Sequence, residues 1–307
     1  MGTMRRLLPL VCVLSVTAAC NDSTLVNAPV PGCADEIEAQ TQPLTLAPVA
    51  RVPRRTDVPV MSTPSAMFAA PSADDMIRAM GSEPDADDPA VLVGSPLASA
   101  VFTGLGALEP SEGNSFVWLS TGVAGAGTSE SVGDAPAGTQ DGTSFGLGGC
   151  DGPETFDCVQ LRFSFLAPDE AHSIRFDFNF LSTEYPEYVG QGYNDTFFVS
   201  MESPSHNYDN ISFDENGNPI GIDSAFFNDT CEDMQGSGFD LQDGFGGCDA
   251  GATGRLGTIA PVEPGEQVTL TFTLMDSGDG IYDSAVSIDN LQATSNEIQD
   301  PETNDCE

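Results

Sequence analysis

The strictest constraint on the fold of this chain is the alternation of apolar and polar side chains over residues 174–180. Four apolar side chains at the even positions are separated by Arg175, Asp177 and Asn179 at the odd positions. Successive side chains of a β-strand point to opposite faces of its sheet, so this pattern predicts a strand with one apolar face against a core.

Short β-rich runs recur between clusters of Gly, Pro, Asn and Asp, and helical periodicity is scarce. Regular short strands with turn signals favour an all-β fold, an antiparallel β-sandwich or jelly-roll-like domain, over an α/β fold. Asn216 and Gly217 are a strong signal for a hairpin turn. We expect strands at residues 90–93, 100–103, 115–120, 159–166, 174–181, 196–202, 210–214, 219–223, 268–275 and 284–293.

The N-terminal part predicts export followed by a tether. Residues 1–19 combine two arginines, a short apolar run and small residues before Cys20, which is typical of a signal peptide. Residues 20–71 are rich in Pro, Ala and Thr and predict a disordered tether. Residues 74–80 predict a short helix capped by Ser72 or Asp74. A β-sandwich domain then spans residues 72–295, and residues 296–307 form a polar, acidic tail.

Cys20 is a candidate lipidation site. Small residues followed by cysteine resemble a bacterial lipobox, in which Cys20 is diacylated and becomes the mature N-terminus. The apolar run before it is too short to span a bilayer permanently, so the lipid is the expected membrane attachment. The alternative is ordinary signal cleavage after Ala19. The expected location is the bacterial cell envelope or surface, and the outer membrane if the cell is Gram-negative.

Six further cysteines follow Cys20. An even number in an exported chain predicts three disulfides, although six cysteines allow 15 pairings. Local pairs Cys150/Cys158 and Cys231/Cys248 would each close a Gly-rich loop. Cys33 and Cys306 would then remain to link the two ends of the chain. The six candidates are Cys33, Cys150, Cys158, Cys231, Cys248 and Cys306.

The charge of the chain restricts its partners. Its formal net charge is −38, and all nine basic residues are arginine. Such a field repels nucleic acid and anionic lipid and attracts cations, so binding to DNA or RNA is excluded.

Three segments in the chain have distinctive sequences: NSFVWLSTG at residues 114–122, LSTEYPEYVGQGYNDTFFVSM at 181–201 and DSGDGIYDSAVSIDN at 276–290. In this order they resemble an upstream element, the signature and a closing element of the choice-of-anchor L domain, a bacterial cell-surface β-rich domain. The resemblance covers roughly residues 74–294. It implies the fold and a surface location more than an activity, because the family has no established reaction.

Spaced oxygen ligands within these segments predict a calcium site. Two acidic elements, at residues 184–195 and 276–290, lie at expected strand ends, where the loops of a sandwich can meet. Their oxygen-bearing side chains suit calcium. The alternative is that Asp and Asn at turns bond their own backbone. The candidate ligands are Glu184, Asn194, Asp195, Asp276, Asp279 and Asp283.

The sequence predicts a non-enzymatic protein, a surface-displayed adhesion or interaction module for an extracellular protein or glycan. The alternative is a carbohydrate-binding module with Tyr185 and Tyr188 as contacts, and a glycoside hydrolase using Glu184 and Glu187 is a more distant one. A G-x-S-x-G match at residues 142–146 lacks the strand and helix that the motif requires. His172 and His206 are therefore expected to be ordinary loop or strand-edge residues.

Overall fold

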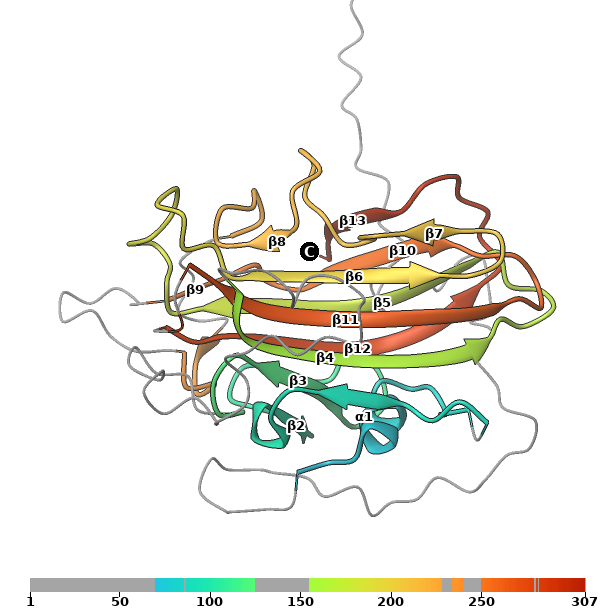
Figure 1. Ribbon diagram of the computed structural model, residues 1–307, viewed down its shortest axis with the longest axis horizontal. Coiled ribbons are helices and arrows are strands. Elements are labelled where there is room, and N and C mark those ends of the chain that lie inside the picture. The colour runs from blue at the N-terminus through green and yellow to red at the C-terminus, as the bar shows by residue number, and fades with distance from the viewer. Residues whose placement is uncertain are drawn as a thin grey trace, which may run out of the picture.

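Two antiparallel sheets pack against each other in the computed structural model (Figure 1), which describes residues 70–85, 87–124, 155–227, 234–239, 250–278, 280 and 282–306. The β11 sheet has the strand order β1-β4-β11-β6-β7, with β8 also pairing with β6. The β12 sheet has the order β13-β10-β5-β12-β3-β2, with β9 also pairing with β5. The all-β sandwich is therefore confirmed.

The strands of the β11 sheet are β1 (Val91–Val93), β4 (Thr155–Leu166), β6 (Thr196–Glu202), β7 (Asn207–Tyr208), β8 (Ile220–Gly221) and β11 (Gln267–Ser277). Those of the β12 sheet are β2 (Ser99–Phe102), β3 (Phe116–Ser120), β5 (Ser173–Ser182), β9 (Gly251–Ala252), β10 (Leu256–Pro261), β12 (Ser284–Thr294) and β13 (Glu302–Asp305). Two short helices precede β2, namely α1 (Ala73–Ala79) and the 3-10 helix η2 (Pro96–Ala98).

Strands that follow one another in the chain often lie in different sheets. The chain passes from β4 in the β11 sheet to β5 in the β12 sheet, returns to β6, and later passes from β11 to β12. The strands β11 and β12 each pair with two long neighbours, β4 and β6 for β11, and β5 and β3 for β12. One continuous segment therefore supplies a central strand to each sheet.

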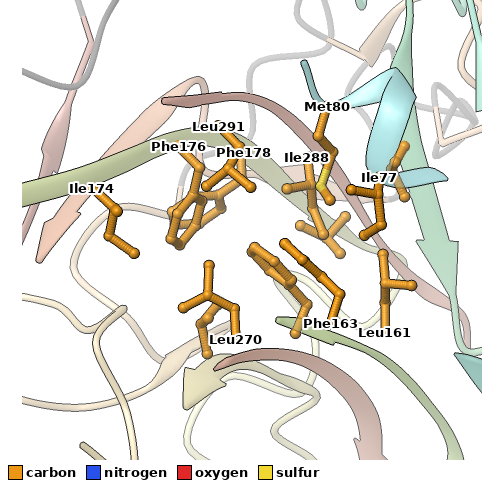
Figure 2. Close-up of a cluster of buried hydrophobic side chains, with 14 of the residues drawn as sticks. Ile77, Met80, Leu161, Phe163, Ile174, Phe176, Phe178, Leu270, Ile288 and Leu291 are labelled. Atoms are coloured by element: carbon orange, nitrogen blue, oxygen red, sulfur yellow. The ribbon is translucent and has the colours of Figure 1, made fainter. Parts of the chain in front are cut away.

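The main core lies between the two sheets, as the alternation in β5 predicts. Ile174, Phe176 and Phe178 point from β5 toward Leu270 of β11, and Phe163 of β4 packs with them (Figure 2). Aromatic contacts extend across both sheets through the ring of Phe272, whose centroid lies 5.0 Å from that of Phe176 and 6.0 Å from that of Phe163.

The helix α1 closes one side of this core. Its N-cap is Ser72, whose side-chain oxygen accepts the N–H of Asp75 while the Asp75 carboxylate accepts the N–H of Ser72. This capping box satisfies two donors at the helix start and fixes where the helix begins. Ile77 and Met80 are buried and reach the core (Figure 2).

A second, smaller core covers the outer face of the β12 sheet. Phe116 and Trp118 alternate with Val117 and Leu119 along β3, so the two pairs point to opposite faces. The indole of Trp118 is fully buried, and its ring centroid lies 6.1 Å from that of Phe239. This end of the β12 sheet is thus buried on both faces.

Three local features differ from the sequence predictions. Residues 210–214 form no regular strand: Asn210 Oδ1 instead accepts the backbone N–H groups of Val199 and Ser212. The strand β10 lies in a stretch for which no strand was predicted. Residues 302–305, within the predicted acidic tail, form β13 and pair with β10. The predicted hairpin turn is present, since the N–H of Gly217 donates to the carbonyl of Asp214.

Cys158 and Cys306 are both disulfide-bonded. The four other disulfide candidates and the lipidation candidate Cys20 lie outside the described residues, as do the predicted signal peptide and the tether up to residue 69. The pairing pattern therefore stays a prediction. Among the described residues, no helix is long and apolar enough to cross a membrane.

Candidate functional site

Three of the six predicted calcium ligands meet at one end of the sandwich. Glu184 follows β5, Asp195 precedes β6, and Asp276 lies near the end of β11. One carboxylate oxygen from each residue lies within 4.8 Å of the others. The exposed fractions are 1%, 0% and 1% respectively, so these three carboxylates, called the carboxylate trio here, are shielded from bulk water.

Backbone and hydroxyl donors hold Asp195 in place. Its Oδ1 accepts the N–H of Ser277 at 3.1 Å, and its Oδ2 accepts the hydroxyl of Ser284 at 2.5 Å. Its own N–H donates to Glu184 Oε2 at 3.4 Å. Because Ser277 ends β11 and Ser284 begins β12, Asp195 ties the start of β6 to both central strands.

Asp276 is in an unfavourable electrostatic position. Burial raises its pKa well above the usual range for an aspartate, and the charge of Asp195 and a hydrogen bond with that carboxyl raise it further. The charges of Glu184 and Asp157 act in the same direction. Its Oδ1 atom is buried and has no hydrogen-bond donor within the part of the chain that the structure describes.

Asp157 is a fourth carboxylate near the trio, and the sequence analysis missed it. It lies in β4 with 1% of its surface exposed and has a positive φ of 43°. The register between β11 and β4 shifts between Leu274 and Asp276, opposite Asp157, and a bulge of this kind can re-aim a side chain. The carboxylate lies close to Gly280, where an added Cβ would be 2.9 Å from Asp157 Oδ2. An aspartate just before the predicted strand at 159–166 was the only signal in the sequence.

The three other predicted ligands are placed differently. Asn194 Oδ1 accepts the N–H of Asp223 at 3.2 Å, so this amide serves a neighbouring turn. Asp283 is buried but outside the trio, and a Cβ on Gly122 would lie 2.2 Å from its Oδ1. Asp279 lies outside the described residues.

The segment between Glu184 and Asp195 forms an exposed turn with half-buried tyrosines. The centroid of the Tyr188 ring lies 5.5 Å from that of Tyr193 and 5.3 Å from that of Tyr282. The Tyr185 ring lies 5.0 Å from Phe227. We call residues 185–193 the tyrosine loop. Its two predicted glycan contacts, Tyr185 and Tyr188, therefore have partners within the protein but keep part of their surface in solvent.

The arrangement of the two glutamates does not fit glycoside hydrolysis. Glu184 is buried in the trio, whereas Glu187 is exposed on the tyrosine loop. A glycosidase needs two carboxyl groups that flank one sugar bond. Trp118, the one tryptophan available to line a sugar cleft, belongs to the second core. The G-x-S-x-G match lies outside the described residues.

A second buried polar cluster lies on the outer face of the β12 sheet. Asp177 and Asp289 are paired in register, and their exposed fractions are 2% and 5%. Asp289 Oδ2 accepts the N–H groups of Ser111 and Glu112 at 2.8 and 3.0 Å, and Asn290 Nδ2 donates to Asp177 Oδ2 at 2.7 Å. Burial is the main cause that raises the pKa of Asp177 to about 7 and that of Asp289 to about 6.

The β12 strand is bulged at this second cluster. Asn290 has a φ of 56°, and the register with β5 shifts between Asp289 and Gln292. Arg175 Nη2 donates to Gln292 Oε1 at 3.0 Å. The cluster fixes the loop that contains residues 111 and 112 onto the sheet. The alternation in β5 predicted these polar side chains on the outer face, but nothing in the sequence indicated that a loop would bury them.

The fold and the site define an all-β sandwich module that carries acidic and aromatic residues in the loops at one of its ends. The sequence matches the model of the choice-of-anchor L domain over residues 100–293, from β2 to β12, and the chain belongs to this family. This is a non-catalytic, surface-associated domain type. The segments that resembled the family therefore identified it correctly.

Two solved structures resemble the fold distantly. One is TmCBM61 in complex with β-1,4-galactotriose, with 10% identity, a TM-score of 0.30, and coverage of 67% of this chain and 87% of that chain. The other is the enzymatically active domain of bacteriophage CBA120 tailspike protein 4, with 9% identity, a TM-score of 0.27, and coverage of 68% and 19%. A comparison with curated protein sequences finds no match.

Proposed function

We propose that this protein is displayed at the bacterial cell surface as a non-catalytic adhesion or interaction module. Family membership supports the surface association. The signal-like residues 1–19 and the lipobox-like Cys20 support export and a lipid anchor, in the outer membrane if the cell is Gram-negative. The tether up to residue 71 would separate the domain from the membrane.

The observation that carries the proposal is the exposed tyrosine loop on a rigid scaffold. Val189 is an exposed apolar side chain, with 44% of its surface in solvent, and half-buried tyrosines lie beside it. Both ends of the loop are fixed, since Glu184 and Asp195 are buried against the strands. Binding residues are often carried on loops that a rigid scaffold positions, and tyrosine combines a large apolar surface with a polar tip.

The test is a binding assay with the full mature chain, in which Cys20→Ala keeps the protein soluble. Immobilised cell-wall and extracellular fractions serve as the probe. We expect Val189→Ser to lower the binding by tenfold or more. Leu166→Ser is the matched control because Leu166 is 60% exposed at the opposite end of β4, about 35 Å away along the strand. Equal binding of both variants would overturn the role of the loop.

The second candidate is carbohydrate binding, which the partly exposed tyrosines favour. Tyr185 and Tyr188 offer aromatic faces on which a sugar ring can stack, while the net charge of −38 disfavours anionic glycans. A glycan array would then show binding to neutral sugars that is lost in Tyr188→Ala. Binding to protein fractions alone would reject this candidate and keep the interaction module.

The anchor has its own test. Mass spectrometry of the mature N-terminus is expected to find a diacylated Cys20. An unmodified Cys20 would remove the lipid anchor and leave the surface association to another mechanism.

A further inference from the structure

We propose that the carboxylate trio of Glu184, Asp195 and Asp276 binds one calcium ion, with the negative charge of Asp157 nearby. The trio flanks the tyrosine loop but is not part of the exposed surface that carries the proposed function. The calcium site can therefore be correct even if the proposed function is wrong.

The first argument is the burial of like charges. The three trio side chains are almost completely buried, and their nearest oxygens lie within 4.8 Å of one another. Buried carboxylates are costly unless they are paired with a positive charge or coordinate a metal. The charges that act most strongly on Asp276 are all negative and come from Asp195, Glu184 and Asp157.

The second argument is the buried oxygen of Asp276. Its Oδ1 atom has no donor among the described residues, although Asp276 is only 1% exposed. A buried polar atom without a hydrogen-bond partner is rare in a folded protein, and a bound ligand would explain it. A cation in the trio supplies the missing partner and neutralises the repulsion in one step.

The donor set favours calcium. The trio contains carboxylate oxygens and neither cysteine nor histidine, which excludes a typical structural zinc site. Calcium accepts six to eight oxygen ligands in a flexible geometry, while magnesium demands a regular octahedron. The trio comes from the strand β11 and from the two ends of a loop, an irregular arrangement that suits calcium.

The ion would join three parts of the fold. Glu184 follows β5 of the β12 sheet, whereas Asp195 directly precedes β6 and Asp276 lies in β11, both strands of the β11 sheet. Calcium would therefore link the two sheets at this end and fix both ends of the tyrosine loop.

The experiment measures thermal unfolding and calorimetric binding of the full mature chain after treatment with EDTA. We expect one calcium ion per chain with a Kd of roughly 10⁻⁴ to 10⁻³ M, as in extracellular modules. At 100 times the Kd the melting temperature should rise by about 5 to 10 °C. An equal rise with magnesium would overturn the choice of calcium.

Two variants and a control locate the site. Asp276→Asn should weaken calcium binding at least tenfold and should melt at the same or a higher temperature than the parent in EDTA, because it removes a repelled charge. Glu184→Gln should weaken binding likewise. Asp169→Asn, an exposed aspartate beyond the other end of β4, should leave binding unchanged. Unchanged calcium binding in Asp276→Asn and Glu184→Gln, or an Asp276→Asn protein that melts earlier in EDTA, would overturn the proposal.

Discussion

Asp177→Asn should make the protein more stable at neutral and alkaline pH. Asp177 is 2% exposed, and burial raises its pKa from the usual 3.8 to about 7. The folded state therefore holds a proton on Asp177 at pH values where the unfolded chain has released it. The stability that this retained proton gives the folded state is fully present below pH 3.8 and is lost as the pH rises from there through 7.

The size of this stability effect follows from the shift in the pKa of Asp177. Each pKa unit corresponds to about 1.4 kcal/mol, so a shift of about three units gives roughly 4 kcal/mol in total. Between pH 5 and pH 8 the wild-type chain should lose about 2.5 kcal/mol from this residue alone. Asparagine is neutral and its side-chain oxygen can still accept the hydrogen bond from Asn290 Nδ2. The free energy of unfolding of Asp177→Asn should therefore not fall in this way between pH 5 and pH 8.

The assay is urea denaturation of the wild-type chain and of Asp177→Asn at intervals from pH 5 to pH 8. Asp289 has a pKa of about 6 and titrates in the same range. The quantity to follow is therefore the difference between the two proteins, which isolates Asp177. The exposed Asp300→Asn is the matched control and should run parallel to the wild type. A difference between wild type and Asp177→Asn that stays constant within about 0.5 kcal/mol over this range would refute the reasoning.

Three further predictions concern stability. Phe272→Ala removes a fully buried ring from the centre of the core and should lower the free energy of unfolding by about 3 to 5 kcal/mol in urea denaturation. Ser72→Ala removes the acceptor for the N–H of Asp75 and should cost about 1 kcal/mol, with faster amide exchange in α1 as the local readout. Gly106→Ala places a Cβ 1.9 Å from the carbonyl oxygen of Gln235 at a φ of +62° and should cost roughly 1 to 3 kcal/mol in thermal unfolding. A loss below about 0.5 kcal/mol in Phe272→Ala or Gly106→Ala would contradict the packing described for that site.

The β5 strand could be predicted because apolar and polar side chains alternate along it. Residues 174–181 were predicted as a strand for this reason, and residues 196–202 because they form a β-rich run; they correspond to β5 and β6. The β10 strand has no such alternation of apolar and polar side chains, and it contains Gly257 and Pro261. The β13 strand is polar, and its pairing with β10 gives it order that its composition does not indicate.

The candidate site could be predicted in part. Glu184, Asp195 and Asp276 lie next to turn residues in recognisable segments, which allowed them to be singled out before their distances were known. Asp157 could not be found in this way, because its position depends on a register shift in β4. The burial of Asp177 depends on a loop more than sixty residues earlier in the chain, and no local pattern encodes such a contact.

The central positions of β11 and β12 also bear on how fast this protein folds. The pairing of β11 with β4 joins Ser164 to Thr269 across 105 residues, and that of β12 with β5 joins Ser173 to Thr294 across 121 residues. Folding slows when contacts connect distant parts of a chain, because the entropy of closing long loops is lost before the contacts form. Neither sheet can acquire its middle strand until residues 267–294 arrive, so the two sheets should form together, slowly, in a single late step.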